Sequence, residues 1–211
     1  LKPTLPDVAQ LRDVRLQIPL RVYSRDGRLL GQIGEQRRVP VTWEEIPPVV
    51  VHAVLAAEDD RFFQHPGVDW QGVLRALMVA AFTMEASQGG STLTQQLVRT
   101  TLITKEKQLR RKLREIFLSL QLENELTKNE IFTLFVNTQF LGQRSYGFAA
   151  GAETYFGKSL AEVNASEAAL LAGILKAPSR LNPSASLQAA TDRRAYVLRR
   201  MHELDYLDEE A

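Results

Sequence analysis

The chain has 211 residues, of which 45% are hydrophobic and 24% charged, with 26 basic and 25 acidic side chains and a net charge of +1. These figures are typical of a globular protein with a sizeable core and exclude an intrinsically disordered chain. The absence of cysteine excludes disulfides and cysteine-ligated zinc. A net charge near zero would disfavour a polyanionic partner if the charges were evenly spread along the chain. They are not evenly spread.

The first 47 residues differ in pattern from the rest. The runs 20–24 and 28–33 flank an Asp26-Gly27 pair, which is a strong hairpin signal, so we expect a small β-hairpin there. Pro47 and Pro48 then interrupt the chain. We therefore divide it into an N-terminal linker segment at 1–47 and a mainly helical domain at 48–211.

The first expected helix, 49–63, places a carboxylate in an apolar stripe. That stripe is formed by Val51, Val54, Leu55 and Phe62. Glu58 falls in its middle and Asp59 at its edge. Burial raises the pKa of a carboxyl group, which suits a group that exchanges protons near neutral pH. Two alternatives stay open, namely a helix that ends earlier and a structural ion pair with an arginine.

A second helix is expected over 91–103, after the glycines that end at Gly90. Ser91 or Thr92 can cap its free N–H groups, and a helix start after glycines suits an anion. Its polar face carries groups suited to sugar hydroxyls or a phosphate, namely Thr92, Gln95, Gln96 and Arg99. The alternative is a solvated helix surface.

A third helix, 108–123, has an expected apolar face made of Leu109, Leu113, Ile116, Phe117 and Leu120. Arg111 and Glu115 are expected almost opposite this face, one turn apart, and one interpretation is an exposed i,i+4 ion pair. However, the run 105–114 contains six cations and only one acid, Glu106. Such a run usually binds phosphate, nucleic acid or anionic lipid, and here it surrounds one carboxylate.

The later helices carry clear start signals. Thr127-x-x-Glu130 and Asn164-x-x-Glu167 are capping boxes, and the tail 187–204 has apolar residues at helical spacing. The sequence therefore predicts a mainly α domain.

Five segments in chain order resemble the motifs of the peptidoglycan glycosyltransferases (glycosyltransferase family 51). Residues 58–67 resemble EDxxFxxHxG, 90–96 resemble GxSTxTQQ, 111–115 resemble RKxxE, 128–142 resemble the fourth motif, and 193–198 resemble RRxxVL. The residues before the domain, at 19–24 and 46–48, are similar to class A penicillin-binding proteins of the 1a type. Phe135 stands where the fourth motif usually has tyrosine, so no contact is assigned to it.

This resemblance implies a lysozyme-like helical fold with a head lobe and a smaller jaw. It also implies polymerisation of lipid II into β-1,4 glycan strands, with the growing lipid-linked glycan chain as the donor. Glu58 would be the general base that deprotonates the 4-OH of the incoming sugar, and attack would invert the anomeric centre while polyprenyl pyrophosphate leaves. The expected substrate-binding residues are Asp59, Phe62, His65, Gly90, Ser91, Thr92, Thr94, Gln95, Gln96, Arg99, Lys107, Arg111, Lys112 and Asn137.

The expected role of the cations is to meet the charge that develops on the pyrophosphate. Glu115, the second catalytic candidate, would orient these cations, ligate a divalent metal ion such as Mg²⁺ or Mn²⁺, or steady the leaving group. No organic cofactor is expected.

Because the implied substrate is a membrane lipid, we expect the protein to contact a membrane. The apolar segment Val73–Met84 is too short to span a bilayer but suits shallow insertion at a membrane surface, although a buried core helix is the alternative. The resemblance further implies a transmembrane anchor before residue 1 and a transpeptidase domain after residue 211. We thus expect a location in the periplasm or at the outer face of the bacterial cytoplasmic membrane.

Two other functions fit parts of the sequence. A lysozyme-like glycan hydrolase or lytic transglycosylase also uses a glutamate in a helical fold, but it needs no cationic site for pyrophosphate. A helical nucleic-acid-binding module would use the cations at 105–114 but would leave Glu58, Gln95 and Gln96 unexplained, so no nucleic-acid partner is expected.

Overall fold

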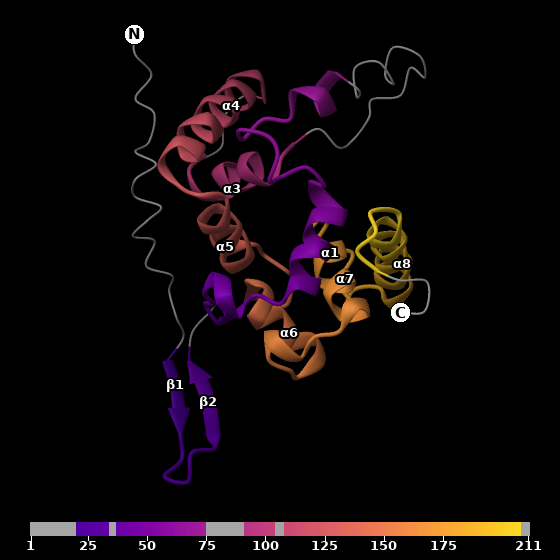
Figure 1. The fold of residues 1–211 in the computed structure, drawn as a ribbon. Coiled ribbons are helices and arrows are strands. Elements are labelled where there is room, and N and C mark those ends of the chain that lie inside the picture. Colours follow the sequence, from indigo (N-terminus) through magenta and orange to yellow (C-terminus); the bar gives the residue numbers. More distant parts are fainter. Residues whose placement is uncertain (1–19, 34–36, 75–90, 104–107, 208–211) are drawn as a thin grey trace. The chain divides into compact units, whose positions relative to one another are not determined.

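The computed structural model describes residues 20–33, 37–74, 91–103 and 108–207, and helices predominate among them (Figure 1). The chain divides into two compact units. Unit 1 contains the described residues between 58 and 135, and unit 2 contains those between 20 and 57 and between 136 and 207. The mainly helical class predicted from the sequence is therefore confirmed, whereas the predicted domain boundary at 47/48 stays a prediction.

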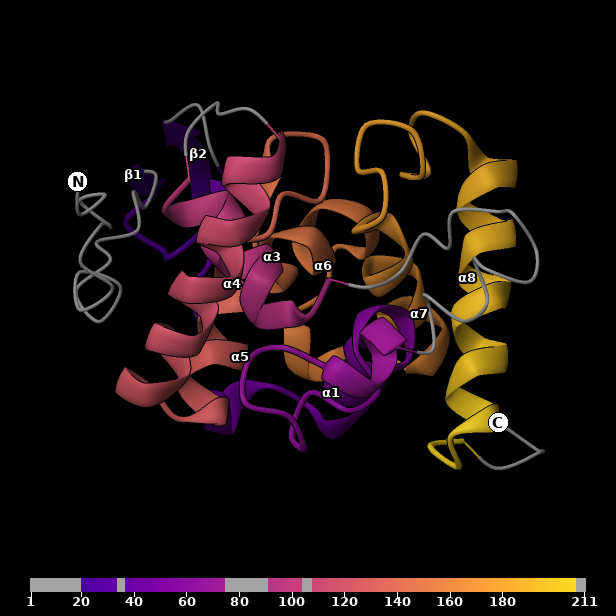
Figure 2. The same ribbon diagram turned by 90° about the horizontal axis from the view of Figure 1, so that it is seen from above.

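Unit 1 is built around helices α3 (Leu93–Thr101) and α4 (Gln108–Glu125), followed by the start of α5 (Lys128–Thr138). Helix α3 packs along α4, as both views of the ribbon show (Figure 2). Its buried side chains are Leu93, Leu97 and Val98. Phe62, which precedes α3 in the chain, is also buried. This core fixes α3 beside the middle of α4.

Helix α4 buries a different face from the one predicted. Leu113 and Phe117 are 59% and 60% exposed, whereas Glu115 is only 2% exposed. The buried side of the helix is the stripe of Glu115, Leu118, Ser119 and Leu122, whose spacing is equally helical. The expected apolar face was therefore wrong at Leu113 and Phe117, because the contacts with α3 select the stripe that contains the acid.

Unit 2 contains the predicted hairpin, in which β1 (Leu20–Tyr23) pairs antiparallel with β2 (Leu29–Ile33). A second, parallel pair joins β3 (Arg37–Arg38) to β4 (Ser145–Tyr146). The helices of this unit are α1 (Pro48–Glu58, except for its last residue), the end of α5, α6 (Phe148–Phe156), α7 (Ala165–Ile174) and α8 (Leu187–Glu203), with short 3₁₀ turns at Trp43–Glu45 and Leu160–Glu162.

Helix α7 is the centre of unit 2. Every residue from 168 to 174 is buried, and both α6 and α8 pack against this helix. Gly173 allows α8 to come close, since a Cβ at this position would lie 3.0 Å from Cγ of Arg193. Close approach of α8 to α7 thus depends on a residue without a side chain.

None of the helices in the described ranges is long and apolar enough to cross a membrane. The predicted membrane-contacting segment Val73–Met84 lies outside the described residues from position 75 onward, so its contact with lipid stays a prediction.

Candidate active site

Glu58 is the last residue of α1, so the helix ends five residues earlier than the sequence pattern predicts. Its carboxylate oxygen Oε2 accepts a hydrogen bond of 2.8 Å from Nε2 of Gln96, which lies on α3. The residue is half-buried. The helix end thus places the predicted base against the polar face of α3, where it keeps partial access to solvent.

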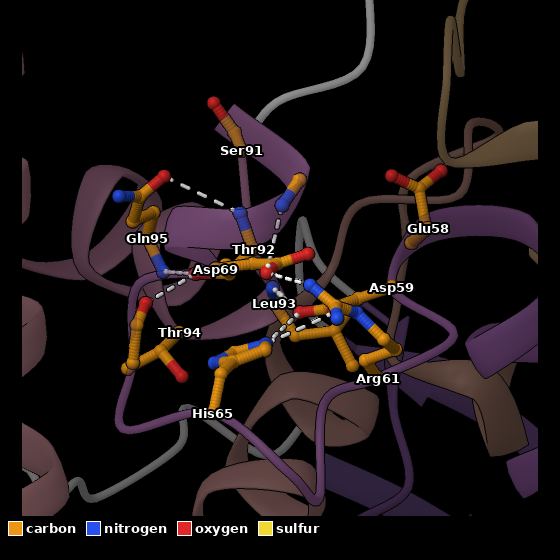
Figure 3. A network of polar contacts seen from close by, with 12 residues as sticks. Glu58, Asp59, Arg61, His65, Asp69, Ser91, Thr92, Leu93, Thr94 and Gln95 are labelled. Carbon is orange, nitrogen blue, oxygen red and sulfur yellow. Dashed lines mark hydrogen bonds and ion pairs between the residues drawn. The ribbon is translucent and has the colours of Figure 1, made fainter. Parts of the chain in front are cut away.

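The next residue, Asp59, faces the interior of unit 1. Its carboxylate oxygens lie 3.0 and 3.1 Å from Nε2 of His65, and Oδ2 also accepts the backbone N–H of Leu93 at 3.0 Å. Figure 3 shows this pair below α3, with Glu58 pointing away from it. Asp59 and His65 are both more than nine-tenths buried. They therefore fasten the segment after Glu58 to the first turn of α3, and substrate contact by either residue stays a prediction.

Thr92 caps α3. Its hydroxyl accepts the backbone N–H of Gln95 at 3.2 Å, and the side-chain oxygen of Gln95 accepts the N–H of Thr92 at 3.3 Å. The same hydroxyl donates to the carbonyl oxygen of Gly67 at 2.6 Å. Of the two caps predicted from the sequence, Thr92 is the one that the structure uses.

A cationic cluster lies where α4 meets the start of α3. Nζ of Lys112 is 3.0 Å from Oγ of Ser91, 3.2 Å from Oε1 of Gln95 and 3.5 Å from Oε2 of Glu115. Nε of Arg111 is 3.5 Å from the other oxygen of Glu115. The Arg111–Glu115 pair therefore exists, and the alternative of an ordinary exposed pair does not apply because the carboxylate is buried. Two cations around one carboxylate leave a local positive charge.

The two parts of the site are joined by a continuous chain of polar contacts. Glu58 is bonded to Gln96, and Nε2 of Gln96 lies 3.5 Å from the carbonyl oxygen of Ser91. The hydroxyl of Ser91 accepts from Lys112, which in turn reaches Glu115. One carboxylate and one cation cluster are thus held by Gln96 of α3 and by Ser91, which precedes this helix. This arrangement can accept a proton on one side and receive an anion on the other.

An ion pair in the loop that follows Glu58 was not predicted from the sequence. The guanidinium of Arg61 bonds the side chains of both Asp69 and Gln71. Burial alone would raise the pKa of Asp69, but the backbone N–H of Gly72 and the charge of Arg61 together hold this pKa below its usual value. No motif or periodic pattern indicated this contact.

Glu123 and Lys128 form a second ion pair that was not predicted from the sequence. Nζ of Lys128 is 2.8 Å from the carboxylate of Glu123, which also accepts a hydrogen bond of 2.5 Å from the hydroxyl of Thr94. Thr94, predicted to bind substrate, is fully buried in this position.

The remaining predicted residues are spread more widely. Arg99 is exposed in the last turn of α3, and Phe62 is fully buried beside Phe132. Asn137 lies in unit 2, where its amide bonds both the N–H and the carbonyl of Val41 at 2.9 and 2.8 Å. Gly90 and Lys107 lie outside the described residues.

The surroundings of Glu115 do not fit a divalent metal ion. The ligand atoms that Mg²⁺ and Mn²⁺ prefer are oxygens, whereas both carboxylate oxygens of Glu115 face the cations Arg111 and Lys112. Within the described ranges, no group of three or more His, Asp or Glu side chains has the arrangement of a metal site.

Comparison with known proteins shows a match to one family over most of the chain. The family model described as Transglycosylase matches residues 26–202. Penicillin-binding protein 1A of Escherichia coli is 49% identical over 210 residues, and penicillin-binding protein 1A of Vibrio cholerae is 47% identical over 207 residues. These alignments cover 100% and 98% of this chain but only 25% of each relative.

The chain therefore spans about a quarter of the length of the curated relatives that it matches. Among solved structures, penicillin-binding protein 1A of Haemophilus influenzae aligns with 93% of this chain and 20% of its own, at 31% identity and a TM-score of 0.49.

Proposed function

Because the chain belongs to the transglycosylase family, we propose that it polymerises lipid II into β-1,4 glycan strands. The observation that carries this proposal is the chain of contacts from Glu58 through Gln96 and Ser91 to Lys112. It joins a half-buried carboxylate to a cation cluster, and these are the two groups that transfer of a sugar from a pyrophosphate requires.

In the proposed reaction, the 4-OH oxygen of the incoming sugar attacks C1 of the donor sugar. The bond between C1 and the pyrophosphate oxygen breaks, the hydroxyl proton passes to the carboxylate of Glu58, and the α-linkage becomes β. A sugar hydroxyl is a weak nucleophile, so a positioned base lowers the barrier. The amide of Gln96 orients the carboxylate through its hydrogen bond of 2.8 Å.

Lys112 and Arg111 are proposed to bind the leaving pyrophosphate. Negative charge accumulates on its oxygens as the C1–O bond breaks, and fixed cations stabilise that charge without reorganising. Glu115 is assigned the role of holding both cations, since its two oxygens each face one of them. Of the three roles considered for Glu115, orientation of the cations is the one that this geometry favours.

The setting of the reaction is also part of the proposal. Lipid II is anchored in a membrane, so we place the domain at the outer face of the bacterial cytoplasmic membrane, with Val73–Met84 touching the lipid. Because relatives about four times as long are named penicillin-binding proteins, we expect a transpeptidase domain to follow this region in the full-length protein. The chain itself contains neither Ser-x-x-Lys nor Lys-Thr-Gly, so it is not expected to react with penicillin.

The proposal is tested by incubating the purified protein with lipid II and, separately, with finished peptidoglycan. Release of polyprenyl pyrophosphate and growth of glycan strands from lipid II would support it. Cleavage of finished peptidoglycan without release of pyrophosphate would assign the site to a glycan hydrolase or lytic transglycosylase instead.

A further inference from the structure

The ion pair between Lys128 and Glu123 has no role in the reaction proposed above, yet it is well shielded from water. Lys128 is the first residue of α5 and Glu123 lies near the end of α4, and their side chains are 21% and 8% exposed. Withdrawing two charges from water is costly unless further hydrogen bonds satisfy them. We therefore expect both charges of this pair to make further polar contacts.

Those contacts reach the segment that follows the base. Nζ of Lys128 donates to the carbonyl oxygen of His65 at 2.7 Å and lies 4.3 Å from the ring centroid of Phe62. Two of the three N–H groups of the ammonium thus have protein acceptors, and the aromatic ring covers the charge. These contacts engage the ammonium within the protein, so we assign Lys128 no contact with the pyrophosphate.

Glu123 extends the same set of contacts to α3. Its carboxylate accepts the hydroxyl of Thr94, so the pair touches α3, α4, α5 and the segment 59–67. Asp59 binds the first N–H of α3, and Thr92 donates to Gly67, so both ends of that segment are attached to the start of α3.

At Gly67 the segment packs closely against α4. Gly67 has φ of +84°, and a Cβ at this position would lie 2.9 Å from Cγ of Glu123 and 3.0 Å from the carbonyl oxygen of Ser119. A displacement of Glu123 or Lys128 is therefore transmitted to the backbone between Asp59 and Gly67. Glu58 adjoins this backbone directly, and its carboxylate accepts a hydrogen bond of 2.8 Å from Nε2 of Gln96.

We propose that Lys128, together with Glu123, positions the general base. The pair clamps residues 59–67 between α3 and α4 and thereby sets where the carboxylate of Glu58 lies relative to Gln96. This inference rests on the proposed function of Glu58. It makes Lys128 a positioning residue, because its ammonium acts through the protein and does not touch the substrate.

The test compares Lys128→Met, Lys128→Arg and a matched control, Lys158→Met, in the lipid II polymerisation assay. Lys158 forms an ion pair of 2.6 Å with Glu167 in unit 2, so its substitution reports the cost of losing a part-buried pair outside unit 1. All variants are assayed at a temperature at which circular dichroism shows each to be fully folded. Hydrogen exchange of residues 59–67 is measured in the same proteins.

Lys128→Met is expected to lower kcat about 10- to 100-fold, the loss typical of a misplaced catalytic group, with KM unchanged. Lys128→Arg should recover most of the activity, because a guanidinium can reach both the carboxylate and the carbonyl. Exchange in 59–67 should become faster in Lys128→Met and stay unchanged in Lys158→Met.

A kcat of Lys128→Met within about twofold of wild type, or an equal loss in Lys158→Met, would refute the positioning role. Unchanged exchange of 59–67 in an active enzyme would refute it as well. Failure of the wild-type protein to release polyprenyl pyrophosphate would instead refute the proposed function, and the exchange data would then still decide whether the pair holds the segment.

Discussion

Replacement of Gly67 by alanine probes how tightly the segment after Glu58 is packed on α4. The residue has φ of +84°, in the left-handed region that side chains disfavour. The added methyl carbon would lie 2.9 Å from Cγ of Glu123 and 3.0 Å from the carbonyl oxygen of Ser119. One of these neighbours is helix backbone and cannot rotate away, so the substitution should be strongly destabilising.

The size of the effect follows from two contributions. A left-handed conformation costs an L-residue about 1–2 kcal/mol. Overpacking of a filled interior adds about 1–3 kcal/mol. Gly67→Ala is therefore expected to lower the free energy of unfolding by about 2–5 kcal/mol. Gly157 is a matched control, because it has φ of +65° and no atom within 4 Å of an added Cβ, so Gly157→Ala should show only the first contribution.

The assay is urea unfolding at 25 °C, followed by circular dichroism and extrapolated linearly to zero denaturant. Gly67→Ala should be less stable than Gly157→Ala by about 1–3 kcal/mol. Equal stabilities of the two variants would show that the segment moves away from α4 at little cost, and the close packing inferred around Gly67 would be wrong.

Three further changes test other parts of the account. Lys112→Met should lower kcat about 100-fold or more in release of polyprenyl pyrophosphate, because a fixed cation facing the leaving group is lost; a loss below about threefold would contradict this. Asp69→Asn should destabilise the protein at pH 7 in urea unfolding, and this destabilisation should shrink as the pH falls below about 4. Burial opposes ionisation of Asp69, but its hydrogen bonds and Arg61 hold its pKa below the usual value. The ionised carboxylate therefore stabilises the protein above about pH 4, and this stabilisation disappears as the pH falls through the folded-state pKa. A difference in unfolding free energy between variant and wild type that does not change with pH would refute this. Tyr206→Ala removes a ring stacked on His52 at 4.3 Å and should cost about 0.5–1.5 kcal/mol of stability. Burial lowers the pKa of His52, so NMR titration should show this pKa rising in the variant, and an unchanged pKa would refute the shielding by Tyr206.

The starts of helices could be predicted where the signal is local. Thr127 and Glu130 exchange hydrogen bonds at the start of α5, as Asn164 and Glu167 do at the start of α7. Each capping box is completed within four residues, so no information about the rest of the fold is needed. Glu58 stands out from the sequence in the same way, as an acid in an expected apolar stripe, but its role as the base stays a prediction.

The buried face of α4 could not be predicted in this way. Hydrophobicity alone favours burial of Leu113 and Phe117, yet the buried stripe contains Glu115. That carboxylate is stable in the interior because Arg111 and Lys112 accompany it, and Lys112 is held in turn by the start of α3. The choice between the two faces depends on this tertiary contact, which the sequence of one helix does not contain.

Contacts across irregular segments could not be predicted from the sequence either. Asp59 and His65 are bonded across a loop, so no helical or strand period relates them. Glu123 and Lys128 lie on either side of the junction between α4 and α5, where spacing alone gives an ordinary surface pair. Their burial and their shared contact with the segment 59–67 emerge only when three helices are assembled.

Glu58 is proposed to be the base that deprotonates the acceptor sugar. The most direct test of this role is the rate at which Glu58→Gln releases polyprenyl pyrophosphate from lipid II, since the glutamine amide preserves shape and the contact with Gln96 but cannot accept the proton. A loss of about 10²- to 10⁴-fold in kcat, with the fold retained by circular dichroism, is predicted. A variant that keeps more than about a tenth of the wild-type rate would contradict the assignment of Glu58 as the base.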